Sequence, residues 1–213
     1  MSDVNAADMT ALVYRARKEW TPAFGGAQWS LGIAWYTHLE EGKGREYFAN
    51  VDASRVRVDI ALPGLVAFVE GGLELLLDGR VEPRRGFAGP GVHVFPAGGP
   101  CAKDGGDVHF DTEGLTPAER ASRVEAFTFV LMLQPAESGG GLRVWNERFD
   151  PDDPTPEAER GTGTPALVTY GPGDLLVLDS YRLHQIEPFG GTKDRISLTC
   201  HAVLADARWQ IWF

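Results

Sequence analysis

From Phe87 to the C-terminus, short apolar runs alternate with Gly, Pro and Asp. Runs of four to eight residues separated by turn residues are typical of strands, and they leave little room for helices. The pattern predicts a mainly β fold, and the spacing favours a sandwich, jelly roll or barrel. We expect strands at residues 91–95, 107–110, 127–134, 142–145, 166–170, 175–178, 184–187, 195–204 and 209–213.

The first part of the chain has a different character. Apolar residues recur at helical spacing over residues 6–19, and a second helix is expected within residues 63–77. A strand is expected at residues 31–38. Further on, Thr116, Pro117 and Glu119 have the spacing of a helix N-terminus with a capping box. With 213 residues the chain is expected to form one domain, a mixed helical part over 1–86 and a β core over 87–213.

Composition excludes several classes of protein. The formal net charge of −10 argues against nucleic-acid binding, which depends on neutralising phosphates. Cys101 and Cys200 lie far apart and form no CxxC motif, which excludes a disulfide framework and a cysteine-based zinc knuckle. The polar start of the chain and the interrupted apolar stretch at 60–77 predict no signal peptide and no membrane span. We therefore expect a cytoplasmic protein with neither nucleic acid nor membrane as partner.

A candidate metal site lies in the sequence Asp107-Val108-His109-Phe110-Asp111. On an extended chain, His109 and Asp111 point to the same face and can reach one ion. His184 is a candidate third ligand. Two imidazoles and one carboxylate form a facial triad, which leaves positions open for other ligands and suits Fe(II). The alternative is that His109 is a structural histidine beside a turn.

A second cluster lies eleven residues after His184. In the run 195–201, the polar residues occupy alternate positions and share one face of the expected strand. An arginine at Arg195 that points into a barrel needs an anion, because an unpaired buried charge is costly. Arg195 with Ser197 is therefore a candidate clamp for a carboxylate. The alternative is a surface arginine on an edge strand.

These residues, in this order, resemble the Fe(II)/2-oxoglutarate-dependent oxygenase superfamily over about residues 88–204, in its prolyl-hydroxylase-like or small-molecule hydroxylase branch. The run from Gly139 to Trp145 and the strand that leads into His184 are similar to that family as well. The resemblance implies a double-stranded β-helix, a jelly roll flanked by N-terminal α-helices. It implies that His109, Asp111 and His184 hold Fe(II). It further implies that Arg195, with Ser197, binds the distal carboxylate of 2-oxoglutarate, and that O2 is consumed.

The chain departs from the family pattern in ways that bear on the branch. The strand expected before the iron motif offers only His93 where prolyl hydroxylases often have a tyrosine. Those enzymes usually bind 2-oxoglutarate through a lysine, whereas this chain has Arg195. The carboxylate of Asp111 argues against halogenation, which needs that position open. Ser197 and Thr199 stand where the nucleic-acid demethylases have an asparagine and a second arginine.

Substrate contacts are expected from the residues that follow the triple glycine. Arg143 and Trp145 share a face of their expected strand, and a surface ion pair is the alternative for Arg143. The acidic, proline-rich segment 146–165 is either a lid, with Gly161 and Gly163 as hinges, or a disordered insertion.

The sequence thus predicts a 2-oxoglutarate-dependent dioxygenase that hydroxylates a small polar molecule, such as an amino acid or a biosynthetic intermediate, and releases succinate and CO2. A protein side chain is the alternative substrate. Two other classes remain open: a cupin-like metal enzyme, although the chain lacks the usual HxH motif, and a jelly-roll binding domain that does not use 2-oxoglutarate.

Overall fold

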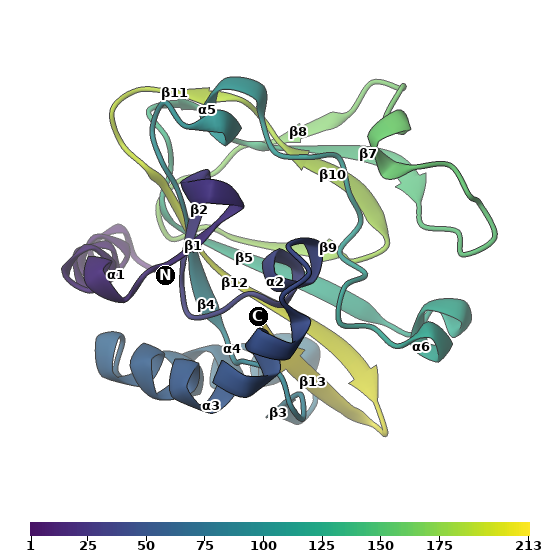
Figure 1. The fold of residues 1–213 in the computed structure, drawn as a ribbon, viewed down its shortest axis with the longest axis horizontal. Helices are drawn as coiled ribbons and strands as arrows, with labels where there is room; N and C mark the ends of the chain where they lie inside the picture. Colours follow the sequence, from purple (N-terminus) through teal and green to yellow (C-terminus); the bar gives the residue numbers. More distant parts are fainter.

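The structure, a computed structural model, describes residues 1–213 and has a large antiparallel sheet at its centre (Figure 1). Two smaller groups of strands complete the β structure. The large sheet contains β1 (Thr21–Ala23), β2 (Gln28–Leu31), β3 (Val81–Pro83), β4 (Gly91–Phe95), β5 (Ala126–Gln134), β9 (Leu175–Asp179), β12 (Arg195–Ala205) and β13 (Arg208–Trp212). The second sheet contains β7 (Leu142–Arg148), β8 (Ala166–Val168) and β10 (Arg182–Ile186), and a short pair contains β6 (Ser138–Gly139) and β11 (Phe189–Gly190).

Strand β12 organises the large sheet. Its first half pairs with β4 and its second half with β13, while its other edge pairs with β5, which in turn pairs with β9. All pairs are antiparallel except β13 with β3. The expected jelly roll with flanking helices is confirmed, because the chain passes between the two sheets from β5 through β6 to β7, and again from β9 directly to β10.

The helices lie mainly in the N-terminal third of the chain. They are α1 (Asp3–Arg15), α2 (Trp35–Glu40), α3 (Gly44–Ala61), α4 (Leu65–Leu77), α5 (Pro100–Asp104) and α6 (Pro117–Ser122), with 3-10 turns at Arg17–Glu19, Phe24–Gly26 and Glu157–Glu159. In Figure 1, α1, α3 and α4 lie on one side of the large sheet, whereas α2 lies nearer its opposite side. No single helix is long and apolar enough to cross a membrane, and α3 with α4 meets that test only as a pair bent by 93°.

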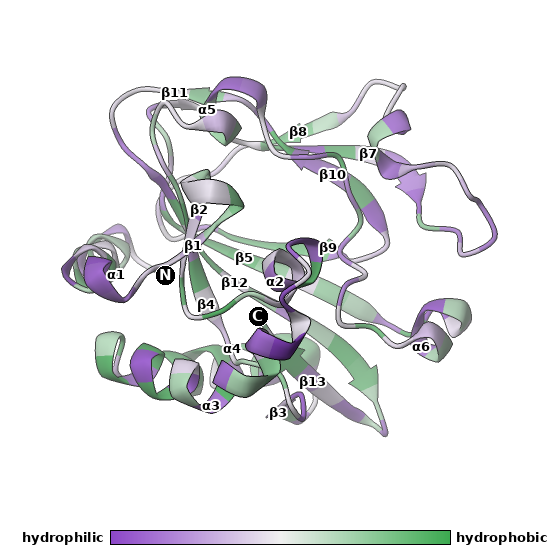
Figure 2. Cartoon of the chain, in the orientation of Figure 1, coloured by the Kyte–Doolittle hydropathy of each residue, from purple (hydrophilic) through white to green (hydrophobic).

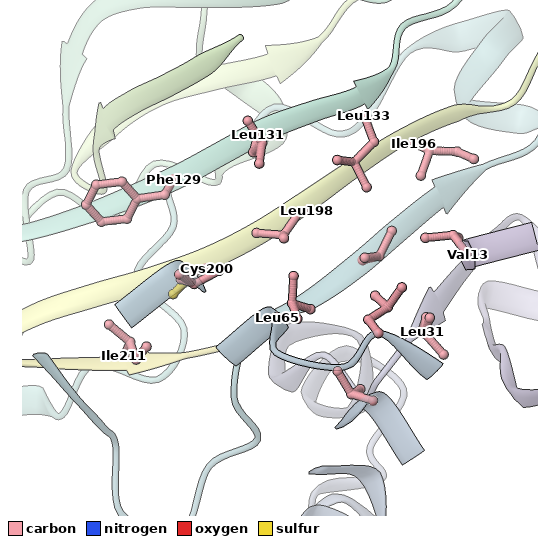
Figure 3. Packing of buried hydrophobic residues seen from close by; sticks show 14 of the residues in the cluster. Val13, Leu31, Leu65, Phe129, Leu131, Leu133, Ile196, Leu198, Cys200 and Ile211 are labelled. Carbon is pink, nitrogen blue, oxygen red and sulfur yellow. The ribbon is translucent and has the colours of Figure 1, made fainter. Parts of the chain in front are cut away.

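The main hydrophobic core fills the space between the large sheet and α1, α3 and α4. Ile196, Leu198 and Cys200 of β12 are buried there against helix residues such as Leu65 (Figure 3). Colouring by hydropathy shows that the central strands are mostly apolar, whereas α1 and α3 mix polar and apolar residues (Figure 2). Burial of this apolar area is the main source of stability.

The alternate residues of β12 face the other side of the sheet. Arg195, Ser197, Thr199 and His201 are all buried, yet they line a cavity instead of the apolar core. One strand therefore separates the helix-covered core from a polar interior. The period of two that the sequence showed over residues 195–201 is confirmed.

Some expected elements differ in the structure. Residues 31–38 do not form one strand, because β2 ends at Leu31 and α2 begins at Trp35. Residues 107–110 form only a single bridge, at His109. Helix α3 was not expected, and of its apolar residues only a stripe of Tyr47, Val51 and Val58 is buried. The capping box at Thr116 is confirmed at the start of α6.

Candidate active site

A cavity of about 450 Å³ lies on the polar face of the large sheet. Its walls come from β4, β5 and β12, from the loop that contains His109, and from β10 of the second sheet. Volumes of this size are typical of small-ligand sites. The cavity contains both sequence-predicted clusters, the triad and the Arg195 pair.

His109, Asp111 and His184 meet at one end of this cavity, as predicted. A backbone bridge joins His109 to His184, with two N–H···O bonds of 3.0 Å. The Asp111 N–H bonds to the Ser180 carbonyl at 2.9 Å, which fixes the chain that follows His109. One ligand atom from each of the three side chains lies within 4.8 Å of the other two. The backbone thus holds three metal-ligating groups on two adjacent segments.

Backbone carbonyls set the orientation of both imidazoles. The Nδ1 of His109 lies 2.8 Å from the Asp107 carbonyl, and the Nδ1 of His184 lies 2.9 Å from the Arg182 carbonyl. Each Nδ1 therefore carries the proton and donates it. Each Nε2 points toward Asp111, at 3.5 Å from Oδ1 for His109 and 3.3 Å from Oδ2 for His184. Outer hydrogen bonds of this type orient histidines that bind a metal through the other nitrogen.

The donor set fits a divalent metal ion. Asp111 is buried, and no lysine or arginine side chain forms an ion pair with it. Burial raises the pKa of its carboxyl, but the neighbouring imidazoles of His184 and His109 hold that pKa well below its usual range. Asp111 is therefore an anion. Two imidazole nitrogens and one carboxylate form the facial arrangement that suits Fe(II) and leaves positions open.

Thr128 on β5 supports the carboxylate from below. Its hydroxyl donates a 2.6 Å hydrogen bond to Oδ2 of Asp111. The Thr128 Oγ1 also lies 3.2 Å from the Ser180 hydroxyl and 3.1 Å from Nδ1 of His201. A hydroxyl has one proton and two acceptor positions, so Ser180 and His201 must be the donors in these two contacts. The polar group beneath Asp111 is fully hydrogen-bonded.

Arg195 lies in the cavity away from the triad. It is only 2% exposed, and no carboxylate of the protein forms an ion pair with it. Its Nε donates to the Gly140 carbonyl at 2.9 Å, and its guanidinium lies 5.6 Å from the ring centres of Phe95 and Tyr170. A buried cation with no anion is costly, so the geometry calls for an anionic ligand. Ser197 lies beside it on the same face of β12.

The triple glycine brings the chain close to Arg195. Gly140 has φ +72°, a conformation that strains other residues. A Cβ on Gly139 would lie 2.3 Å from the Pro188 carbonyl oxygen, and one on Gly141 would lie 2.5 Å from that of Val168. The three glycines therefore allow the backbone contacts that place the Gly140 carbonyl on the guanidinium.

The structure does not place Arg143 and Trp145 among the residues that line the cavity. Arg143 lies on the outside of the second sheet, 3.8 Å from Glu187, which matches the alternative of a surface ion pair. Trp145 is buried against Phe110, and its indole donates a 2.8 Å hydrogen bond to the Gly163 carbonyl. Alternation along a strand showed that these residues share a face, but not which face points inward.

The segment 146–165 folds back over the site. Arg160 forms ion pairs of 3.0 Å with Glu147 and 2.9 Å with Asp153, and its guanidinium lies 5.6 Å from the ring centre of Phe110. Phe110 lies in the chain between the two candidate metal ligands His109 and Asp111. The turn at Glu157 reaches the cavity wall. The segment is therefore built against the triad.

Several residues at the site were not found from sequence. Thr128 is a lone polar residue in the apolar run of β5, which is the signal that could have found it. Tyr170, beside Arg195, has no comparable signal. Glu40 and Glu157 come from segments remote from the motif, and only the fold brings them to the cavity.

Comparisons with known proteins place this fold. No protein-family model and no curated protein sequence matches the chain. Several solved structures do match the chain. An N-substituted L-amino acid dioxygenase from Burkholderia ambifaria AMMD is 17% identical, with 97% of this chain and 82% of that chain covered and a TM-score of 0.55. A second structure of that enzyme contains alpha-KG, with 14% identity, 97% and 82% coverage and a TM-score of 0.54.

Two further structures agree. AviO1 from Streptomyces viridochromogenes Tue57 is 17% identical, with 97% of this chain and 87% of that chain covered and a TM-score of 0.54. An oxidoreductase of the 2OG-Fe(II) oxygenase family from Burkholderia pseudomallei is 11% identical, with 89% and 74% covered and a TM-score of 0.50. At these identities the likeness establishes the fold. The fold that the sequence resemblance implied is thereby confirmed, and the chain has the jelly-roll fold found in the 2-oxoglutarate/Fe(II) oxygenases.

Proposed function

We propose that this protein is an Fe(II)- and 2-oxoglutarate-dependent oxygenase that hydroxylates a small polar molecule. The observation that carries the proposal is the pairing of two sites in one cavity. A triad of metal-ligating atoms lies at one end, and Arg195, a buried cation without a protein anion, lies in the same space.

Each group has a role in this chemistry. His109, Asp111 and His184 would hold the iron, which supplies the oxidising power when 2-oxoglutarate and O2 are bound. Arg195 would pair with the distal carboxylate of 2-oxoglutarate through its guanidinium, with the Ser197 hydroxyl as a further donor. The carbonyls on both Nδ1 atoms keep each Nε2 free for the metal. Succinate and CO2 are the expected co-products.

The cavity volume supports a small molecule as substrate. About 450 Å³ must hold both the co-substrate and the substrate, which leaves room for a compound of amino-acid size. A cupin-like enzyme without 2-oxoglutarate would leave Arg195 without an anion. Cys101 and Cys200 are both free thiols, which supports the cytoplasm as the proposed compartment.

The test is an anaerobic titration of the metal-free protein with Fe(II) and then 2-oxoglutarate, followed by the weak visible absorption band of the iron–2-oxoglutarate pair. We expect a band in the wild type and none in Asp111→Ala or Arg195→Ala. Asp111→Ala should lose iron, whereas Arg195→Ala should keep iron and lose 2-oxoglutarate. If folded, iron-loaded wild type shows no band, the proposal fails and the cupin-like interpretation replaces it.

A further inference from the structure

Three carboxylates come together at the wall of the cavity near His109. Glu40 is the last residue of α2, Glu113 follows the metal motif, and Glu157 lies in the 3-10 turn of segment 146–165. None of the three forms an ion pair or accepts a side-chain hydrogen bond from a cationic group of the protein. Three separate segments of the chain thus bring carboxyl groups to one wall of the cavity, and none of these groups is in an ion pair.

Their surroundings compensate these charges only in part. Burial raises the pKa of Glu40 and of Glu157, and the carboxylates of Asp107 and Glu157 add to the rise at Glu40. His109 lowers both pKa values, and the Phe110 backbone N–H and the charge of Arg160 lower that of Glu157 further. A cation bound between them would remove the repulsion and gain from the reduced exposure to water.

The cavity supplies no mobile cation of its own. No lysine lines it, and Arg195 is its only arginine. Arg195 is held by the Gly140 carbonyl and lies between Phe95 and Tyr170, at the position assigned above to the co-substrate. An anionic substrate would therefore meet only carboxylates at this wall, which disfavours its entry.

A second, independent feature points to a ligand that donates hydrogen bonds. His201 is 9% exposed and donates through Nδ1 to Thr128, because the single Thr128 proton is already given to Asp111. Its Nε2 is then an acceptor without a protein partner. Thr199, 6% exposed on the same face of β12, also has a hydroxyl without a protein partner. Both residues line the cavity, where a ligand or water can satisfy these polar atoms.

From these observations we propose that the substrate carries a cationic ammonium group, which Glu40 and Glu157 bind at the cavity wall near His109, while His201 accepts a hydrogen bond from another donor of the same substrate. This inference rests on the proposed function, since it names the substrate class of the same site. Glu40 and Glu157 are specificity-determining residues in this scheme. They select the charge of the substrate before the hydroxylation.

The test measures charge preference with three probes of similar shape: 2-phenylethylammonium, 2-phenylethanol and 3-phenylpropanoate. Affinity for each is measured by calorimetry under anaerobic conditions on protein loaded with Fe(II) and 2-oxoglutarate. We expect the ammonium probe to bind about tenfold more tightly than the alcohol, and the carboxylate probe to bind most weakly. The double variant Glu40→Gln/Glu157→Gln should bring the ammonium and alcohol affinities within about twofold of each other.

Glu159→Gln is the matched control, because Glu159 lies two residues from Glu157 in the same turn, is exposed and does not line the cavity. It should keep the wild-type preference. Equal or tighter binding of the carboxylate probe, or an ammonium preference that survives the double variant, overturns the inference. Succinate formation on the same wild-type preparation separates the two levels: without it the proposed function fails, and with it only the ammonium preference is in question.

Discussion

The Thr128 hydroxyl donates a 2.6 Å hydrogen bond to Oδ2 of Asp111, from the strand that lies directly beneath the metal motif. This contact joins the large sheet to the loop that carries two of the three metal-ligating side chains. It also restricts Asp111 to one orientation, with Oδ1 toward His109 and Oδ2 toward His184. The geometry of the triad therefore depends on β5 as well as on the motif itself.

Replacing Thr128 by valine should weaken metal binding without removing any ligand. The substitution keeps the shape of the side chain and removes the only hydroxyl that donates to Asp111. Loss of such an outer hydrogen bond typically costs 10–100-fold in metal affinity, and we expect a change of about that size for Fe(II). Competition with a chelator under anaerobic conditions measures it.

Thr10→Val is the matched control for this variant. Thr10 is also buried and its hydroxyl also bonds within the protein, to the Ala6 carbonyl at 2.9 Å, but it lies in α1. It should change stability alone and leave the Fe(II) affinity within about twofold of the wild type. Equal metal affinities for Thr128→Val and Thr10→Val would show that Thr128 does not support Asp111.

Much of the site could be predicted because its residues lie on one face of an extended segment. His109 and Asp111 are two apart, and Arg195, Ser197, Thr199 and His201 alternate along β12. Alternation needs no knowledge of the rest of the fold. The pairing of His109 with His184 was harder, because it depends on a single backbone bridge and not on a regular strand.

The rest could not be predicted because it depends on where distant segments pack. Glu40 and Glu157 are ordinary polar residues in the sequence, and only the placement of α2 and of segment 146–165 brings them to the cavity. Arg143 illustrates the converse. Arg143 and Trp145 share one face of β7, but that face points away from the cavity, with Arg143 near Glu187 and Trp145 buried against Phe110. Alternation gives faces, whereas the tertiary structure decides which face is inside.

Removing Arg195 should stabilise the protein when no ligand is bound. The guanidinium is buried without an anion, so Arg195→Met replaces an uncompensated charge with apolar volume, and we expect a gain of about 1 kcal/mol or more in the free energy of unfolding. The wild type should gain about 2.7 kcal/mol from 2-oxoglutarate at 100 times its Kd, whereas Arg195→Met should gain nothing. Urea denaturation with and without 2-oxoglutarate gives both values.

Arg84→Met serves as the comparison, because Arg84 is also buried but forms a 2.7 Å ion pair with Glu119. The same substitution should here cost about 2 kcal/mol, since it leaves a charged acceptor without its donor. If Arg195→Met raises the free energy of unfolding and Arg84→Met lowers it, the result supports a role for Arg195 in binding a ligand. A loss of stability at Arg195 equal to that at Arg84 would contradict it.

Arg160→Met should release segment 146–165 from the site. Arg160 joins Glu147, Asp153 and the Phe110 ring, and its side chain is only 7% exposed. Without it, we expect amide hydrogen exchange in residues 150–163 to be about tenfold faster, since local opening no longer breaks these contacts. The KM for the substrate should rise because the turn that carries Glu157 is no longer held at the cavity.

Arg123→Met, which removes only a half-exposed 3.5 Å pair with Asp150, should leave both measurements nearly unchanged. An unchanged exchange rate in Arg160→Met would show that Trp145 alone holds the segment.

The pair of Arg84 and Glu119 should make stability depend on pH in the acid range. Burial raises the pKa of Glu119, but the hydrogen bond and charge of Arg84 outweigh it and lower that pKa below its usual value of 4.5. A lowered pKa means that the carboxylate contributes stability above about pH 4.5, and that this contribution is lost as the pH falls through the folded-state value. We therefore expect Glu119→Gln to be less stable than the wild type by about 1–2 kcal/mol at pH 7, with the gap closing toward pH 3. Urea denaturation at pH steps between 7 and 3 measures this difference in the free energy of unfolding.

Glu82→Gln is the control, because the pair of Glu82 with Arg208 is exposed and should contribute below about 0.5 kcal/mol throughout. A gap for Glu119→Gln that stays constant from pH 7 to pH 3 would mean that the capping box, which glutamine preserves in part, and not the charge of the pair, governs stability here.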